Sequence, residues 1–346
     1  MQLYEMSNEQ RRIFINTAQL HEAYTDTFDK SRAYRGGMHW KKAKDREYLF
    51  RSRDRYGYGQ SLGPRSSETE AIYNRFHENK KNLDNKLNEL RQKLREQARL
   101  CKAVKIARTP KLVTAILRLL EQHKLMGRNL TVIGTNALYA YEASAGVFFE
   151  SGLTSTRDMD ILWDVRTRLR LLSTDPVDTS GLIGILRKAD KTFDPIGRKS
   201  FRAVNHTGYM VDLVKPEPRS IRAKEVRRMG EDGDLEAVEI KNLDWLVSSP
   251  KFTSTVIGED GFPAGMIAPD PRAFALHKLW LGRQQDREPI KKKRDQAQAQ
   301  ALCRLILQYL PTYPFDPKEL KMFPKKIVAE ATSQLEASDL PPGYEG

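Results

Sequence analysis

The sequence predicts an α+β fold, in which a small mixed β-sheet is flanked by an N-terminal helical arm and a C-terminal helical bundle. Three observations lead to this fold class. A long helical repeat occupies residues 66–108, short β-branched runs lie between residues 130 and 214, and helical composition returns after Pro269-Asp270-Pro271. Strands that are followed along the chain by helices are typical of α+β proteins.

Length and composition narrow the class of protein. The chain has 346 residues, which exceeds the usual size of one compact core, and its content of 39% hydrophobic and 30% charged residues is ordinary for a globular protein. A small single-domain binding module and a chain disordered throughout are therefore excluded. Cys101 and Cys303 lack the spacing of a zinc site, so both are expected to be buried, reduced thiols.

The net charge of +14 favours a partner that carries phosphate, because a basic surface attracts polyanions. A surplus of lysine that serves solubility explains the charge equally well. No apolar run is long enough to cross a bilayer, and residues 1–14 lack the apolar core of a signal peptide. We therefore expect a cytoplasmic protein that does not enter a membrane.

The front of the chain reads as a helical arm. Glycine-bearing turns at residues 56–65 predict that residues 1–65 contain shorter helices, followed by one long helix over residues 66–108. We assign residues 1–127 to this N-terminal helical region, which ends with a further helix from Pro110 to the stop at Gly127. The apolar residues of the long helix recur at spacings of three, four or seven: Phe76, Leu83, Leu87, Leu90, Leu94, Cys101 and Val104.

Residues 128–268 are predicted to form the α/β core. Residues 130–133 read as a strand, which ends in Gly134 and leads into a helix over residues 136–145. Residues 269–346 are predicted to form the C-terminal helical region. The remaining elements are strands at 158–165, 201–206, 209–214, 237–240 and 254–257, with a tight turn at 205–208, and helices at 272–281, 295–310 and 317–337.

Three aspartates stand out within the predicted sheet. Asp158 and Asp160 are two residues apart in one strand, so their side chains project from the same face while Met159 and Ile161 face the core. If the strand that contains Asp212 lies beside the first, it adds a third carboxylate to the cluster. Such an arrangement is stable chiefly when divalent cations neutralise it.

Magnesium is the usual ion for carboxylates that also face phosphate oxygens, and manganese is an alternative. Two ions about 4 Å apart can lower the pKa of an attacking hydroxyl and neutralise charge in an in-line displacement. We assign metal binding to all three acids, and we expect Asp212 to draw the proton from the hydroxyl. An isolated Asp-x-Asp pair is weak evidence for a metal site, however, since a solvated strand edge carries the same pattern.

Gly134-Thr135 supports the active-site interpretation, because it follows a strand and opens a helix, where exposed backbone N–H groups suit a phosphate. Glycine lets a ligand approach the backbone closely. A plain strand-to-helix turn would have the same composition.

Together these residues resemble the polymerase-β-like nucleotidyltransferases, whose signature is a Gly-Ser or Gly-Gly turn, then Asp-x-Asp, then a third acid on a neighbouring strand. The resemblance is greatest to the abortive-infection and type IV toxin branch. Its Thr-Arg/Lys-Asp-x-Asp motif is matched by Thr156-Arg157-Asp158-Met159-Asp160, and its later motifs by His277-Lys278-Leu279 and Lys293-Arg294-Asp295. The resemblance covers residues 128–310.

The resemblance implies that Lys278 contacts the triphosphate, that Asp295 closes the site, and that Gly134, Thr135 and Arg157 belong to the nucleotide-binding residues. A surface lysine on a helix is the alternative for Lys278. Thr135 replaces the usual serine, the gap from Gly134 to Asp158 is long, and Gln298 stands where an acid often follows the Arg-Asp motif. These departures concern the substrate more than the fold.

Two basic segments suggest RNA contact, although each has a simpler explanation. A basic stretch precedes the last motif, where a solvated linker is equally compatible with the composition. Near the N-terminus aromatic and basic residues alternate, which suits base stacking but also packing between helices. The first segment contains Arg283, Arg287, Lys291, Lys292, Lys293 and Arg294; the second contains Trp40, Lys41, Lys42, Tyr48, Arg51, Arg53, Arg55, Tyr56 and Tyr58.

The favoured function is transfer of a nucleoside monophosphate from an NTP to a hydroxyl on RNA, such as a tRNA 3′ end. The resemblance implies a role as a toxin or in phage defence, with an antitoxin protein as a further partner. Adenylylation of a small molecule or a protein is the alternative reaction. A catalytically inactive relative that binds RNA or a partner protein is the third candidate, although retention of three mutually repelling acids disfavours it.

Overall fold

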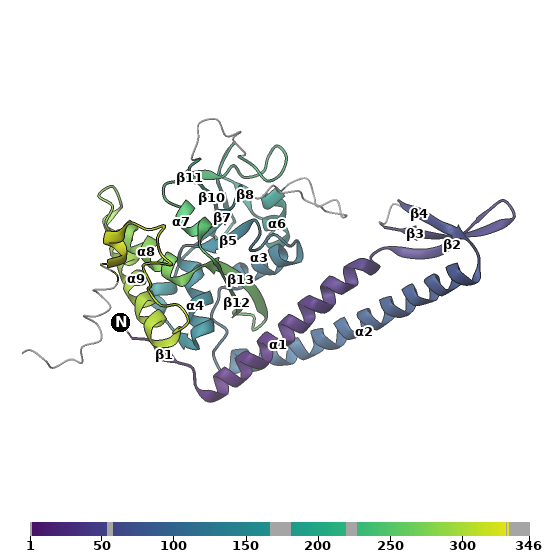
Figure 1. Ribbon diagram of the computed structural model, residues 1–346, viewed down its shortest axis with the longest axis horizontal. Coiled ribbons are helices and arrows are strands. Elements are labelled where there is room, and N and C mark those ends of the chain that lie inside the picture. The colour runs from purple at the N-terminus through teal and green to yellow at the C-terminus, as the bar shows by residue number, and fades with distance from the viewer. Residues whose placement is uncertain (1, 54–57, 167–180, 219–226, 330, 332–346) are drawn as a thin grey trace, which may run out of the picture.

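The computed structural model describes residues 2–53, 58–166, 181–218, 227–329 and 331. A long arm carries a small sheet at its far end and joins a larger body of mixed helices and strands (Figure 1). The predicted α+β fold class is confirmed.

The arm is an antiparallel pair of long helices, α1 (Asn8–Ser31) and α2 (Ser67–Ala103), which lie against each other along much of their length (Figure 1). Ser66 caps α2 by accepting a hydrogen bond from the backbone N–H of Thr69, which fixes where the helix starts. The predicted long helix and helical arm are thus confirmed. The residues of α2 buried in this arrangement include Leu87, Leu90, Leu94, Ala98 and Cys101.

Residues 1–65 contain a helix shorter than α2, as expected, but they also contain strands that were not predicted. After the short helix η1 (Arg32–Tyr34), the strands β2 (Gly37–Ala43), β3 (Arg46–Ser52) and β4 (Gly59–Pro64) form an antiparallel sheet at the tip of the arm. The period in β2 is two, since Met38 is buried while the neighbouring His39 is exposed. Alternation of this kind is typical of a strand that packs one face against a helix, here α2, and exposes the other face.

The central sheet is mixed, and its strands follow the order β5-β7-β10-β9-β8, with β11 paired to the far part of β10. Strands β7 and β10 are parallel, whereas β5 and β9 run antiparallel to their neighbours. The strands of this sheet include the predicted ones, with slightly different ends, and one that was not predicted, β8. Their bounds are β5 Leu130–Ile133, β7 Asp158–Trp163, β8 Asp194–Pro195, β9 Arg202–Val204, β10 Met210–Pro216 and β11 Val238–Ile240.

Helices and a hairpin cover this sheet. Helix α3 (Lys111–Gln122) and α4 (Leu138–Ala145) share one hydrophobic core with the strands and with the C-terminal helices. The hairpin of β12 (Lys251–Ile257) and β13 (Pro263–Pro269) packs beside β5; its second strand was not predicted. The smaller elements are β1 Tyr4–Glu5, paired with β6 Val147–Phe148, and η2 Thr135–Ala137, α5 Ser151–Thr154, α6 Gly181–Ala189 and α7 Asp244–Ser248.

The C-terminal helices α8 (Pro271–Leu281) and α9 (Pro289–Tyr309) pack against each other. Helix α9 begins six residues earlier than predicted, because Pro289 occupies its first turn, a position that proline favours. The helix expected over residues 317–337 is wrong at its start, since helical structure begins at residue 325, directly after Pro324; residues 330 and 332–337 lie outside the described residues.

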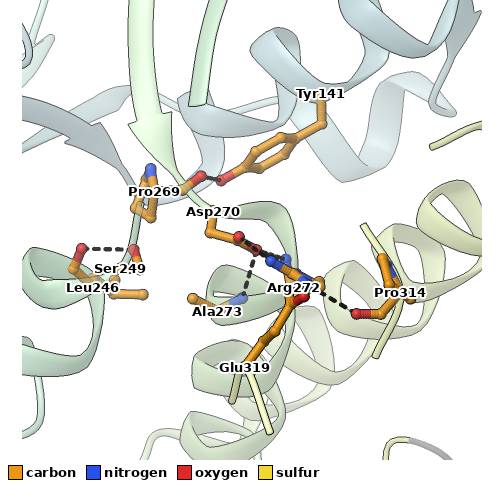
Figure 2. Close-up of polar contacts among 9 residues, drawn as sticks. All are labelled: Tyr141, Leu246, Ser249, Pro269, Asp270, Arg272, Ala273, Pro314 and Glu319. Carbon is orange, nitrogen blue, oxygen red and sulfur yellow. Dashed lines mark hydrogen bonds and ion pairs between the residues drawn. The ribbon is translucent and has the colours of Figure 1, made fainter. Parts of the chain in front are cut away.

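The start of α8 is fixed by a cluster of polar contacts (Figure 2). Asp270 accepts hydrogen bonds from the backbone N–H groups of Arg272 and Ala273, which satisfies two donors that the first helical turn leaves open. The Arg272 guanidinium binds the Asp270 carboxylate at 2.7 Å and also donates to the Pro314 carbonyl at 2.8 Å and to Glu319. The cluster thus joins α8 to the chain that follows α9.

Both cysteines are buried and free, as predicted, and burial raises the pKa of the Cys303 thiol to about 12. None of the helices in the described part of the chain combines the length and the apolar composition that crossing a bilayer requires.

Candidate active site

Asp160 and Asp212 lie directly across from each other on the neighbouring parallel strands β7 and β10. Side chains of paired residues project from the same face of a sheet, so the two carboxylates share one side. Met159 and Ile161 are fully buried on the other face, as expected from the alternation in this strand. Because Asp158 is two residues before Asp160, its side chain belongs to the same face.

The pKa of the Asp160 carboxyl is shifted by the charged groups around it. Burial, together with the negative charges of Asp158 and Asp212, raises its pKa to about 6, although the cations Lys278 and Arg202 act in the opposite direction. Two acids and two cations therefore act electrostatically on a third acid. Perturbation of this kind, by burial together with like charges, is common at catalytic sites.

Gly134 forms the floor beneath Asp160. Its φ of +67° and ψ of −160° belong to a region that side chains disfavour, and a Cβ placed there would lie 2.0 Å from Oδ2 of Asp160. Only glycine leaves room for the carboxylate at this turn.

Thr135 follows in the short helix η2, and its hydroxyl accepts a hydrogen bond of 3.2 Å from the amide of Gln298. The same amide nitrogen donates to the Leu153 carbonyl at 2.8 Å, so this residue of α9 joins η2 to α5 beside the site. Gln298 is 1% exposed, and the role of its amide explains why a neutral residue suits a position where a carboxylate was expected.

The start of β7 is held through the Asp158 backbone. The Asn136 amide donates to the Asp158 carbonyl at 2.6 Å, and the Tyr209 hydroxyl donates to the same oxygen at 3.3 Å. The Thr156 hydroxyl donates to the Asp158 carboxylate itself. Neither Asn136 nor Tyr209 was identified from the sequence, because a hydrogen bond to a backbone carbonyl leaves no motif.

Arg202 is the principal site residue that the sequence did not reveal. It lies across from Asp212 on β9, and its guanidinium binds both carboxylate oxygens, with Nε 2.7 Å from Oδ1 and Nη2 2.6 Å from Oδ2. The Arg202 side chain is 35% exposed, whereas that of Asp212 is 9% exposed. Counting outward from the tight turn at residues 205–208 would have paired positions 202 and 212.

Lys278 and Asp295 meet in a buried ion pair, in which Nζ lies 2.7 Å from Oδ1. Arg287 binds the second carboxylate oxygen at 2.7 Å. Burial opposes ionisation of Asp295, but the two cations outweigh it and lower the pKa of this carboxyl. The two predicted residues are thus brought together. Lys278 forms an ion pair with Asp295 and is also near enough to Asp160 to lower the pKa of that carboxyl.

The neighbouring His277 is structural. It is 4% exposed, and burial lowers the pKa of its imidazole to about 3, with the Lys278 charge acting in the same direction. A ring that stays neutral over the whole physiological range, packed edge-on to Trp245, contributes to the core.

Arg157 is exposed, and its backbone carbonyl accepts a hydrogen bond from Met210, which joins the ends of β7 and β10. The basic stretch at residues 291–294 lies in the first turns of α9, so the interpretation as a linker is wrong for this part. In the N-terminal segment, Arg55 and Tyr56 lie outside the described residues.

Across the described residues, no three histidine, cysteine, aspartate or glutamate side chains are arranged to hold a metal ion as they stand. Two of the three candidate acids have other partners: Asp212 is bound by Arg202, and Asp158 accepts from Thr156.

A comparison with known protein families matches residues 111–322, more than half of the chain, to the family described as Nucleotidyltransferase. The matched segment includes all three aspartates, Gly134, Lys278 and Asp295. The comparisons with curated proteins and with solved structures give no match.

Proposed function

Since this chain belongs to the family described as Nucleotidyltransferase, we propose that it transfers a nucleoside monophosphate from an NTP to an RNA hydroxyl, in a reaction that depends on magnesium held by Asp158, Asp160 and Asp212. The pairing of Asp160 with Asp212 on adjacent parallel strands is the observation that carries this proposal.

The three carboxylates fit magnesium by the chemistry of their oxygen donors, and the same donors accept manganese. Their crowding supports the assignment, because burial and mutual repulsion already raise the pKa of Asp160. When bound, two divalent ions would lower the pKa of the attacking hydroxyl and neutralise charge on the transferred phosphate.

The protein's own groups supply positioning and proton transfer. Gly134 leaves room for the Asp160 carboxylate, we assign nucleotide binding to Gly134 and Thr135 in the turn that follows β5, and Arg157 is exposed next to Asp158. Asp212 accepts the proton of the acceptor hydroxyl. That role requires Arg202 to leave the carboxylate, and a planar guanidinium that is one-third exposed is well suited to turn to the triphosphate instead.

Lys278 and Asp295 act from behind this site. The Lys278 charge favours ionisation of Asp160, and Asp295 holds the ammonium while its own charge is balanced by Arg287. The pair therefore fixes a positive charge beside the acids, where it favours binding of a triphosphate.

An RNA acceptor is supported by the net charge of +14, which favours polyanions over cationic small molecules. The resemblance to the toxin branch suggests a toxin or phage-defence role in the cytoplasm, with an antitoxin as partner. Co-expression with genomic neighbours would test that suggestion by rescue of growth.

The reaction is tested by incubating purified protein with magnesium, each labelled NTP in turn, and total RNA. Label on RNA is the expected result; label on protein or on a small molecule would assign adenylylation of those acceptors, and absence of label with intact RNA binding would indicate an inactive relative. Asp158→Asn should lower the transfer rate at least about a hundredfold, because a metal ion contributes several kcal/mol to the transition state. Asp194→Asn is the matched control, on an exposed strand of the same sheet.

A further inference from the structure

The sheet at the tip of the arm has two different faces. On the inner face, Met38 and Leu49 form a buried cluster with Phe76 of α2. Two hydrogen bonds from α2 hold this face in place, between His77 and the Met38 carbonyl at 2.9 Å and from Lys80 to the Gly36 carbonyl at 2.7 Å. The sheet is therefore rigidly seated on one side only.

The outer face carries aromatic and basic side chains. His39 pairs with Phe50, and Lys41 pairs with Tyr48, in the register of β2 and β3, and these positions alternate with the buried Met38 and Leu49. The rings of His39 and Phe50 lie 5.7 Å apart, and the Lys41 ammonium lies 3.5 Å from the centre of the Phe50 ring. His39 and Lys41 are exposed, and Tyr48 and Phe50 are half-buried.

Positive charge is concentrated around this face. Residues 32–81 contain 13 lysines and arginines against six aspartates and glutamates, so this seventh of the chain holds half of its net charge of +14. Lys42, Lys44 and Arg46 lie in and beside the exposed turn between β2 and β3, and none of them forms an ion pair with a carboxylate in the described part of the chain. Hence the charge is available to an anionic partner.

We propose that the outer face of this sheet, formed by His39, Lys41, Tyr48 and Phe50, binds single-stranded RNA. Aromatic rings on an uncovered sheet can stack with unpaired bases, which duplex RNA does not present, while neighbouring lysines and arginines bind the phosphates. A second copy of this chain is a poorer occupant, because two strongly basic tips repel each other. The choice of RNA rests on the proposed function; the stacking surface and its charge do not.

The tip is far from the candidate active site. Helix α2 has 37 residues, and a rise of 1.5 Å per residue makes it about 55 Å long. Figure 1 shows the tip sheet at the end of the arm that points away from the body. The RNA bound at the tip must therefore be long enough to span this distance if its end is to reach Asp158, and the tip selects acceptors by a feature remote from the reacting hydroxyl.

Binding is tested with the full chain and a labelled single-stranded RNA of about ten nucleotides, the usual footprint of such a surface. Fluorescence anisotropy is measured in EDTA and without NTP, so that RNA binding and nucleotidyl transfer are separated. Tyr48→Ala and Phe50→Ala should each weaken binding about 5- to 150-fold, the range for loss of one stacked base. Lys41→Gln should reduce the salt dependence by about one phosphate contact.

The matched controls are Tyr4→Ala, an exposed aromatic residue on the body, and Lys93→Gln on the exposed side of α2, both of which should bind RNA like the unchanged protein. Lys41 is exposed, so Lys41→Gln separates lost binding from lost folding. The proposal is overturned if the tip variants bind normally, if duplex RNA or a DNA strand of the same sequence binds more tightly, or if Phe50→Ala changes oligomeric state instead of RNA affinity. Transfer without binding at the tip would overturn this inference alone.

Discussion

The Asp160 side chain fills the space that a side chain at Gly134 would need: a Cβ at position 134 would lie 2.0 Å from a carboxylate oxygen of Asp160. The turn that follows β5 and the acid in β7 therefore specify each other, although 26 residues separate them in the sequence. The backbone at Gly134, with a φ of +67°, reinforces this requirement.

Gly134→Ala should displace the Asp160 carboxylate and lower the transfer rate by at least about tenfold, while the strained backbone costs about 1–3 kcal/mol of stability. Steady-state kinetics and urea unfolding measure the two effects. Gly197→Ala serves as control, because its φ is +84° and a Cβ there meets nothing within 4 Å. If both variants lose stability and activity to the same extent, the contact with Asp160 has no separate role.

Arg202→Gln should destabilise the metal-free protein by about 1–3 kcal/mol, since Asp212 then loses a bidentate cation and remains buried. Magnesium should restore more stability in this variant than in the unchanged protein, because the ion takes over the charge balance. Thermal unfolding in EDTA and in magnesium gives the comparison. Arg187→Gln, which breaks an exposed pair with Asp194, is the control; an equal magnesium effect in all three proteins would contradict a metal site at Asp212.

Asp295→Asn should cost about 3–5 kcal/mol, because Lys278 would be left charged and unpaired in the interior. Combining it with Lys278→Met should recover part of that loss, since no buried ammonium then needs a partner. Urea unfolding of both variants decides the point. A double variant less stable than Asp295→Asn would show that Lys278 has another stabilising partner.

The buried imidazole of His277 predicts a loss of stability in acid. Its pKa is about 3 when folded and 6.5 as the ordinary value, so between these pH values the unfolded chain binds a proton that the folded protein excludes, and stability falls as the pH falls. From pH 7 to pH 5 the contribution is about 2 kcal/mol.

His277→Phe should remove that contribution and flatten the dependence of the unfolding free energy on pH over this interval. Unfolding at pH 7 and pH 5 measures the difference. His39→Phe at the exposed tip is the matched control for the substitution itself. Identical slopes in all three proteins would mean that His277 is protonated in the folded state.

The sequence allowed prediction of those parts of the site that depend on short-range periodicity. Alternation fixed the face of Asp158 and Asp160, and the third acid followed from a second strand, Val211-Asp212-Leu213, of the same pattern. The sequence left open whether the two strands pair, because long-range packing decides this. The buried pair of Lys278 and Asp295 could not be foreseen as a pair, because two helices must pack before the residues meet.

Arg202 was missed for a different reason, since a lone arginine at a strand end carries no motif and its role depends on register. The tip strands were missed because glycines and charged residues on both faces obscure their period of two, and because helical sequences flank them on both sides. In each case the information was tertiary, and only the position of the turn at residues 205–208 offered a local clue.

Because α1 and α2 run antiparallel, the length of the arm sets the distance between the tip sheet and the body. The tip sheet connects the end of α1 to the start of α2. Removing seven residues from each helix would therefore bring the tip closer to the body by about 10 Å and rotate it by only about 20°, without changing the body. Related chains that differ only in the length of this helical hairpin would then place the tip sheet at different distances from the reacting end of the same kind of acceptor.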